Sequence, residues 1–339
     1  MLKSIEELYS KEILNEVFAR YGIQENDANF LGGFDSYVYE YKNDRNNLIL
    51  KVTHSFRRTK EEVMDEINWL QYLKENKVSV SGVLPSINGN LVEVYPLGEG
   101  NYFLSTLYEK ALGTSPTIED WNEKLFEEWG QITGRLHSLA IDYKPLQWSR
   151  KNWLDEEYLN VEKYILNDQE IVREKSLNLV KKMKELPKNK NQFGIVHGDL
   201  HYMNFFLNQG EIQLFDFDDI HYNFFINDLA VIIFYAYWRP LSEYKNENEF
   251  EKMLLHFFKG YLKEKTMDKE LFLLLPEFLK VRHLILYIAA LQEIDPMSQS
   301  EEEGKFLVGL KEVIEKDYPI VALNFEEFWH NHIEVEIKK

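Results

Sequence analysis

The periodicity of the sequence changes near Gly113, and no other feature restricts the possible folds as much. Before that residue, a leading segment with helical periodicity is followed by short aromatic or β-branched stretches, which predict strands over 29–33, 36–42, 47–53 and 101–109. A helix is expected over 59–75, and a hairpin around Asn88-Gly89 is expected over 82–96. After Gly113, helical periodicity dominates, over 118–140, 155–186, 224–238, 247–264, 270–292 and 300–316. The sequence therefore predicts an α+β fold with two lobes, a small β-rich lobe over residues 1–108 and a larger, mostly helical lobe over 109–339.

The composition and charge exclude several classes of function. A chain of 339 residues can bury sizeable cores in two lobes, and 45% hydrophobic residues is typical of a globular protein. Cysteine is absent, which excludes disulfides, thiolate metal sites and a cysteine nucleophile. A formal charge of -18 disfavours binding to nucleic acids. No apolar stretch approaches the ~18 to 20 residues needed to cross a bilayer, and the start has no signal-peptide pattern, so we expect a cytoplasmic protein without a membrane partner. We also expect a monomer or homodimer without a nucleic-acid partner.

The segment IVHGDLHYMNFFLNQGEIQLFDFDD, residues 195–219, concentrates the polar side chains that could carry chemistry. Short strands are expected over 193–199, 203–208 and 211–218, with a turn at 208–210. One interpretation is a hydrolytic zinc site: His197, Asp199 and His201 share a face of an extended segment, and His221 or His137 could complete the ligands. A second makes these residues ordinary core and turn positions.

A third interpretation is phosphoryl transfer, and it rests on spacing. Asp199-Leu-x-x-x-Asn204 has the offset of the kinase catalytic loop, and Asp216-Phe217 matches the opening of the D-F-G element that follows it. The chemistry needs one carboxylate near the acceptor hydroxyl and oxygen ligands for Mg²⁺ on the phosphates of ATP. Asp199 would then be the catalytic base, and Asn204 and Asp216 would hold the metal.

The third interpretation also predicts upstream parts, which occur in the required order. The Gly32-Gly33 pair, followed by Ser36, forms a tight turn whose backbone N–H groups could cover phosphates. Lys51 stands alone in an apolar strand, where a lysine is costly without a partner. Glu66, on the helix expected next, would pair with Lys51 and direct its ammonium group to the phosphates.

With these motifs the chain resembles the aminoglycoside phosphotransferase/choline kinase-like family, which shares the protein-kinase fold. The family pattern H-G-D-x-H-x-x-N, then D-F-D-D and D-L-A, is close to HGDLHYMN, FDFDD and DLA in this chain. The resemblance implies a nucleotide loop from Gly32 to Ser36 and a hinge in STLYEKALG, with Leu107 and Tyr108, that reads the adenine. It also implies that Asp228 and His197 brace the catalytic loop.

The sequence departs from protein kinases at two positions that matter. Gly198 stands where they have arginine before the catalytic aspartate, so control by a phosphorylated activation loop is not expected. Asp218 replaces the glycine of D-F-G, which adds a third candidate metal ligand.

The resemblance implies a phosphotransferase that moves the γ-phosphoryl group of ATP, with GTP as the alternative donor, directly to a hydroxyl. Mg²⁺ would be the metal, and the acceptor would be a small alcohol of the aminoglycoside, choline or homoserine type. Aromatic and acidic residues in the C-terminal half favour a cationic acceptor. The zinc hydrolase and a catalytically silent, nucleotide-binding kinase-like module are the alternatives.

Overall fold

The computed structural model describes residues 5, 8–33, 36–42, 47–145, 147–155, 157–166, 168–238, 247–294 and 298–338. The chain divides into two compact units, each discontinuous in sequence. Unit 1 is built from residues 1–114, 144–150 and 205–218, and unit 2 from 115–143, 151–204 and 219–339. The lobe boundary expected between residues 108 and 109 stays a prediction.

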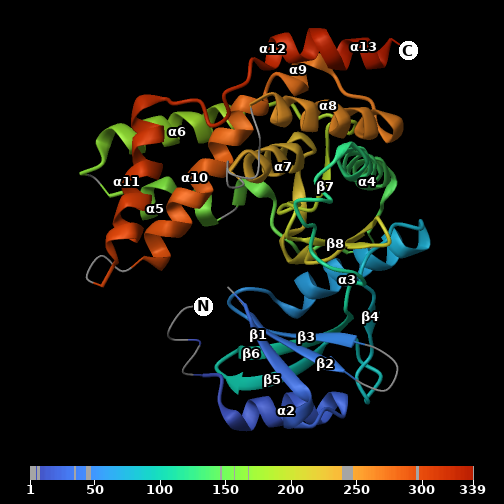
Figure 1. Ribbon diagram of the computed structural model, residues 1–339. Helices are drawn as coiled ribbons and strands as arrows, with labels where there is room; N and C mark the ends of the chain where they lie inside the picture. The colour runs from blue at the N-terminus through green and yellow to red at the C-terminus, as the bar shows by residue number, and fades with distance from the viewer. Residues whose placement is uncertain are drawn as a thin grey trace. The chain divides into compact units, whose positions relative to one another are not determined.

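Unit 1 contains an antiparallel sheet with the strand order β1-β2-β3-β6-β4, in which β5 also pairs with β6 (Figure 1). The strands are β1 (Ala28–Gly32), β2 (Ser36–Lys42), β3 (Asn47–His54), β4 (Val83–Leu84), β5 (Glu93–Gly98) and β6 (Asn101–Glu109). The strands expected at 29–33, 36–42, 47–53 and 101–109 are therefore confirmed to within a residue.

The hairpin predicted over 82–96 is wrong. β4 and β5 do not pair with each other, because each pairs with β6: Leu84 lies opposite Leu107, and Val94 lies opposite Leu104. Three side chains of the intervening loop donate hydrogen bonds to the carboxylate of Glu93. Ser86 Oγ donates to Oε1 at 2.5 Å, and the amide groups of Asn88 and Asn90 donate to the same oxygen. The predicted turn itself forms, since the backbone N–H of Gly89 donates to the carbonyl oxygen of Ser86 at 3.0 Å, but the strands that flank it do not pair with each other.

The two faces of the sheet pack against different helices. In β3, Leu48, Leu50 and Val52 are buried in a core cluster with α2 (Lys11–Tyr21). Because side chains alternate along a strand, Lys51 points to the opposite face. A second cluster there includes residues of α3 (Lys60–Glu75), which confirms the helix predicted over 59–75. The helix begins with a capping box between Thr59 and Glu62.

A β-hairpin from the middle of the chain also belongs to unit 1. It consists of β8 (Phe205–Asn208) and β9 (Glu211–Leu214), joined by Gln209 and Gly210, which both have positive φ. A bridge between Thr114 and Leu207 ties the hairpin to the sheet-bearing segment. The predicted turn at 208–210 is confirmed, and the hairpin delivers Asp216 to unit 1.

Unit 2 is mostly helical. Its helices are α4 (Glu123–Asp142), α5 (Val161–Tyr164), α6 (Glu170–Lys184), α7 (Ile226–Trp238), α8 (Glu247–Glu264), α9 (Lys269–Phe272), α10 (Leu275–Glu293), α11 (Glu301–Lys316), α12 (Phe325–Phe328), the π-helical turn η6 (Trp329–Ile333) and α13 (Glu334–Ile337). The helices expected over 155–186 and 270–292 are each interrupted, the second where Pro276 begins α10. The antiparallel pair of β7 (Phe193–Val196) and β10 (His221–Phe224) carries the catalytic loop, and β10 was not predicted.

Helices α4 and α8 are packed with their backbones in direct contact (Figure 1). Glycines make this possible: a Cβ on Gly130 of α4 would lie 1.8 Å from the carbonyl oxygen of Phe257, and one on Gly260 of α8 would lie 1.8 Å from that of Glu127. The described part of the chain contains no helix that combines the length and the apolarity required for a membrane span.

Candidate active site

The catalytic loop of unit 2 begins after β7 and is held by a buried carboxylate. The backbone N–H groups of His197 and Gly198 donate to Asp228, at the start of α7, over 2.8 and 2.9 Å. His137 of α4 lies with Nε2 3.1 Å from the same carboxylate. Burial raises the pKa of Asp228, but the contacts with His137 and His197 together outweigh it and hold the pKa below its ordinary value. The structure thus shows the bracing of the catalytic loop by Asp228 that the resemblance implied.

His137 is a packed core residue. Since a carboxylate only accepts, Nε2 of His137 donates to Asp228, and Nδ1, 3.0 Å from the hydroxyl of Tyr261, is then the acceptor. Burial lowers the pKa of His137, which favours this neutral form. His137 therefore connects α8, through Tyr261, to the loop.

Gly198 adopts a backbone conformation that L-amino acids rarely take. Its φ is +84°, and a Cβ at this position would lie 2.3 Å from the carbonyl oxygen of Asp219. Only glycine fits between the two chain segments, so the departure from the protein-kinase pattern has a steric cause.

Asp199, the predicted catalytic base, has both carboxylate oxygens engaged. Oδ1 accepts from Nη2 of Arg282 at 2.5 Å, and Oδ2 lies 3.1 Å from Nε2 of His201. The amide of Asn204 donates to the backbone oxygen of Asp199 at 2.8 Å and to Oδ2 at 3.2 Å. Burial raises the pKa of Asp199, but the hydrogen bond from His201 and the charge of Arg282 outweigh it and hold the pKa well below its usual range. The carboxylate is therefore ionised at neutral pH.

The zinc interpretation finds no support in this geometry. No group of three or more His, Asp or Glu side chains within the described ranges is arranged to hold a metal ion. His201 donates to Asp199 through Nε2, and its Nδ1 accepts from the backbone N–H of Met203 at 3.2 Å. Both ring nitrogens are thus used in fixing the loop.

In unit 1, Lys51 faces the segment that follows β9. Its Nζ lies 3.3 Å from Oδ1 of Asp216 and 3.4 Å from Oδ1 of Asp218. Burial lowers the pKa of Lys51, but the carboxylates of Asp218 and Asp216 outweigh it and raise the pKa above its ordinary value. Asp216 has a φ of +59° and a side chain that is 52% exposed. Its carboxylate is therefore accessible to a metal ion.

Asp218 is in a different environment, surrounded by cations. Its carboxylate lies within 3.2 Å of Nη2 of Arg57, and its backbone oxygen accepts from Nη2 of Arg58 at 2.9 Å and from Arg150. Burial raises the pKa of Asp218, but Lys51 and these arginines outweigh it and hold the pKa well below the ordinary value. Asp218 therefore anchors cations, so a metal-binding role for it would require competition with them.

The ion pair predicted between Lys51 and Glu66 is replaced by two other pairs. Glu66, buried in α3, lies with Oε2 3.1 Å from Nη2 of Arg150, and its Oε1 accepts from the hydroxyl of Tyr108 at 2.9 Å. Among the described residues, the carboxylates that pair with Lys51 within 4.0 Å are Asp216 and Asp218. The sequence did not identify Arg150, which supplies the cation that Glu66 needs.

The other predicted nucleotide-binding residues lie in the sheet of unit 1 or, for Gly33, directly beside it. Gly32 and Gly33 have positive φ, and a Cβ on Gly33 would lie 2.0 Å from the backbone oxygen of Ser36. Residues 34–35 of the predicted loop lie outside the described ranges. Leu107 is buried in the core beside β3, and the hydroxyl of Tyr108 is turned to Glu66. Their role as an adenine-reading hinge stays a prediction.

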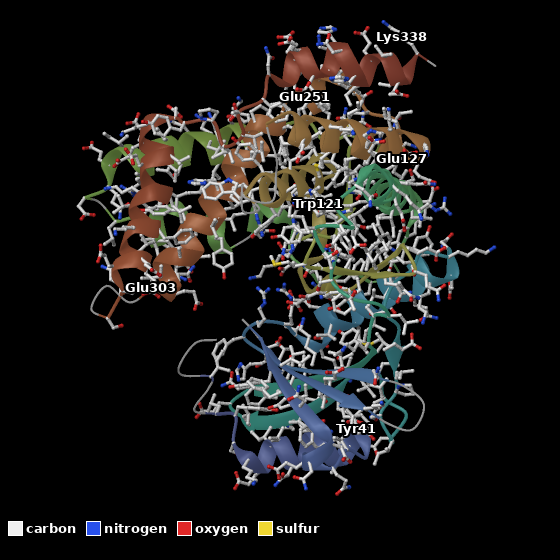
Figure 2. The ribbon with its side chains drawn as sticks, in the orientation of Figure 1. Tyr41, Trp121, Glu127, Glu251, Glu303 and Lys338 are labelled. Atoms are coloured by element: carbon white, nitrogen blue, oxygen red, sulfur yellow. The ribbon has the colours of Figure 1, made fainter. Side chains whose placement is uncertain are left out.

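Some of the aromatic side chains that could meet a cationic acceptor are core residues. Trp129 and Trp153 are buried. Trp121, labelled in Figure 2, is half-buried, and its ring centroid lies 5.7 Å from that of Tyr202 in the catalytic loop. Of these three tryptophans, Trp121 is therefore the one placed beside the proposed chemistry.

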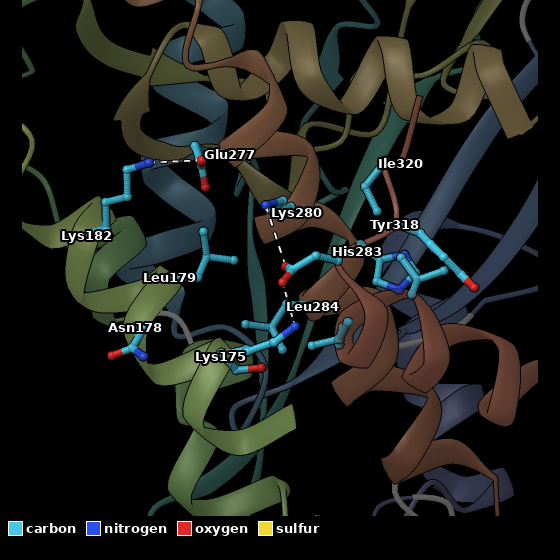
Figure 3. Close-up of a pocket in the computed structure, with 14 residues that line it drawn as sticks. Lys175, Asn178, Leu179, Lys182, Glu277, Lys280, His283, Leu284, Tyr318 and Ile320 are labelled. Atoms are coloured by element: carbon cyan, nitrogen blue, oxygen red, sulfur yellow. Dashed lines mark hydrogen bonds and ion pairs between the residues drawn. The ribbon is translucent and has the colours of Figure 1, made fainter. Parts of the chain in front are cut away.

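A pocket of about 240 Å³ opens between α6, α10 and α11 of unit 2 (Figure 3). Its charged side chains pair with one another: Lys182 lies 2.9 Å from Glu277, and Lys175 lies 2.5 Å from Asp317. None of the site residues predicted from the sequence lines this pocket. Lys280 also lies 3.9 Å from Asp317, so these charged side chains already pair within the pocket and we assign it no chemical role.

A known family combines these motifs in the same order. The model of the phosphotransferase enzyme family matches residues 28–262, more than half of the chain. The chain belongs to this family. Membership confirms the resemblance seen in the motifs and the prediction of an enzyme of the kinase or phosphotransferase type.

Relatives of this phosphotransferase match nearly its whole length. It is 39% identical over 327 residues to the amicoumacin kinase of Bacillus subtilis (strain 168). The aligned region covers 95% of this chain and 97% of the relative. A solved structure of the amicoumacin kinase hAmiN in complex with AMP-PNP, Ca²⁺ and Ami has a TM-score of 0.92 at 34% identity, covering 96% of this chain and 99% of that one. A microcompartment-associated aminopropanol kinase has a TM-score of 0.72 at 18% identity, covering 90% and 95%, which shows the fold alone. The predicted α+β, protein-kinase-like fold is confirmed.

Proposed function

We propose that this phosphotransferase moves the γ-phosphoryl group of ATP, with Mg²⁺, to a hydroxyl of amicoumacin. The observation that carries the proposal is the 39% identity to an amicoumacin kinase over 95% of the chain. The residues that kinase-type chemistry needs, Lys51, Asp199, Asn204 and Asp216, are all present. Their presence argues against a catalytically silent nucleotide-binding module.

In the proposed reaction, Asp199 orients the acceptor hydroxyl and takes its proton. The acceptor O–H bond breaks, a bond forms between that oxygen and the γ-phosphorus, and the bond from the γ-phosphorus to the bridging oxygen breaks, which releases ADP. The proton passes from Asp199 to solvent. An ionised carboxylate fits this role, and its low pKa implies that orientation contributes more than basicity.

The side chains assigned to the metal are suited to Mg²⁺, which prefers carboxylate and amide oxygens. Asp216 offers a half-exposed carboxylate, and Asn204 uses its amide N–H group on Asp199, which leaves its oxygen for a ligand. When bound, the cation would neutralise charge on the phosphates. Lys51, which already compensates Asp216, would contact the same nucleotide.

The decisive experiment measures phosphorylated amicoumacin by mass spectrometry after incubation with ATP and Mg²⁺. The wild type should form one phosphate ester, and Asp199→Asn should reduce kcat by at least ~10³-fold, since it removes the group that orients the hydroxyl. Asp142→Asn, at the exposed end of α4, is the matched control and should remain active. An active Asp199→Asn variant would refute the proposed mechanism, and the absence of product from the wild type would refute the acceptor.

The other nucleotides, metals and acceptors can be compared in the same format. GTP in place of ATP tests the donor, and an acceptor panel with choline, homoserine and aminoglycosides tests the wider family. We propose that a cationic part of the acceptor meets the aromatic faces of Trp121 and Tyr202. Thermal stabilisation by Mg-ATP is expected, whereas stabilisation by zinc alone would favour the hydrolase alternative.

A further inference from the structure

Counting the partners within the described residues, the carboxylate of Asp199 has one acceptor position left. A carboxylate offers about four lone-pair sites, two on each oxygen. Oδ2 receives His201 at 3.1 Å and Asn204 at 3.2 Å, and Oδ1 receives Arg282 at 2.5 Å. The remaining site is therefore on Oδ1, the oxygen that Arg282 holds.

Arg282 is itself fixed by a second element of unit 2. It projects from α10, and the same Nη2 that contacts Asp199 donates to the hydroxyl of Tyr235 on α7 at 2.7 Å. The guanidinium carbon lies 5.0 Å from the centroid of the Tyr235 ring. That ring also lies 4.5 Å from the ring of His201. Tyr235 thus contacts two of the three side chains that hold the Asp199 carboxylate, Arg282 and His201.

We propose that Arg282 is a positioning residue of the phosphotransfer reaction, which turns the Asp199 carboxylate so that the free lone pair of Oδ1 receives the acceptor hydroxyl. The inference rests on the function proposed above and adds a residue to it. Without Arg282, the carboxylate would keep its bonds to His201 and Asn204 on Oδ2 and could rotate about them. Oδ1 would then leave the orientation in which the hydroxyl proton is taken up.

The family motifs do not contain this residue. Arg282 lies 83 positions after Asp199 in a helix whose sequence, LPEFLKVRHLILYIAALQE, is mostly apolar. A cation among these residues, with a side chain that is 17% exposed, needs a partner, and the structure provides the carboxylate of Asp199. Its role is therefore visible only after the helix is placed.

The test is the rate of phosphoryl transfer by Arg282→Ala in the full-length chain. We expect kcat to fall about 10- to 100-fold, because a small misplacement of a catalytic group has effects of this size. The KM for ATP should change less than about threefold, because the loss acts on orientation and not on binding. Lys280→Ala removes a cation from the same helix, one paired with Asp317 at 3.9 Å, and is the matched control with kcat within about twofold of the wild type.

Chemical rescue separates positioning from a merely structural role. Millimolar guanidinium should restore part of the kcat of Arg282→Ala, because it can replace the lost donor, whereas urea at the same concentration should not. Arg282→Lys keeps a charged donor and should lose less activity than Arg282→Ala. If Arg282→Ala is unstable in a thermal unfolding experiment, Arg282→Lys alone carries the comparison.

Three results would overturn the inference. They are a kcat of Arg282→Ala within twofold of the wild type, equal rescue by urea and guanidinium, or a loss confined to the KM for the acceptor. Failure of the proposed function gives a different pattern, in which the wild type transfers no phosphate or Asp199→Asn remains active. The two hypotheses can therefore be rejected separately.

Discussion

The contact between α4 and α8 leads to a quantitative prediction for Gly260→Ala. In an ordinary helix interior, this substitution would stabilise the protein by ~1 kcal/mol, because alanine loses less backbone entropy. Here the new Cβ would lie 1.8 Å from the carbonyl oxygen of Glu127 and 2.9 Å from the backbone nitrogen of Gln131. Because both neighbours are backbone atoms, no rotamer change relieves the clash, and the two helices must separate.

The expected net effect is a loss of stability. Overpacking of this kind costs about 3 kcal/mol, at the upper end of the usual range, because separation loosens contacts along both helices. After subtraction of the gain in helix propensity, the free energy of unfolding should fall by about 2 kcal/mol, which corresponds to roughly 4 to 8 °C in Tm for a unit of this size.

The matched control is Gly309→Ala in α11, where a Cβ would meet no atom within 4 Å. This variant should raise the free energy of unfolding by about 0.5 to 1 kcal/mol, because only the propensity term remains. Differential scanning calorimetry and urea unfolding of both variants provide the measurement. If Gly260→Ala is as stable as Gly309→Ala, the close packing of α4 on α8 is not a constraint and the reasoning is refuted.

Two further predictions concern buried carboxylates. Burial raises the pKa of Glu93, but hydrogen bonds from Ser86 and Arg20 outweigh it and lower the pKa to about 2. The stability that the ionised Glu93 contributes is therefore complete above the ordinary pKa of 4.5 and is lost as the pH falls from there towards 2. Glu93→Gln should therefore flatten the dependence of the free energy of unfolding on pH in this window, by up to about 2 to 3 kcal/mol. Urea unfolding at several pH values measures it, and a slope equal to that of the wild type would contradict the assignment. Asp228→Asn should lower the free energy of unfolding by about 3 kcal/mol and reduce kcat, because an amide group would face the donors that now reach the carboxylate. Urea unfolding at pH 7 measures the first effect, and an unchanged midpoint would contradict it.

The sequence predicted the elements whose signal is local. The strands of the first hundred residues, the helix after Thr59 and the turn at 208–210 were recognisable because aromatic and β-branched strand residues, helical periodicity and turn residues act over a few positions. The spacing from Asp199 to Asn204 and Asp216 indicated the family for the same reason. The turn at Asn88-Gly89 was predicted correctly, but the hairpin was wrong because both flanking strands pair with β6 and not with each other.

The parts that escaped prediction depend on residues far apart in the chain. Arg150 lies 84 positions from Glu66, and Arg282 lies 83 positions from Asp199. In both cases a carboxylate indicated that some cation was required, but nothing in the sequence told which one. The pairing of Lys51 with Glu66 was expected from the order of motifs, and the structure gives each of them a different partner.

The left-handed glycine before Asp199, the proposed catalytic base, limits how this enzyme can be controlled. In many protein kinases, an arginine at that position reads a phosphate on the activation loop and makes activity depend on a second enzyme. At Gly198 the carbonyl oxygen of Asp219 occupies the volume that any side chain would need, and the backbone angle disfavours one as well. A single substitution therefore cannot introduce such a sensor without disturbing the loop that holds the base. The backbone of this loop is therefore incompatible with a phosphate-reading arginine of the protein-kinase type at position 198.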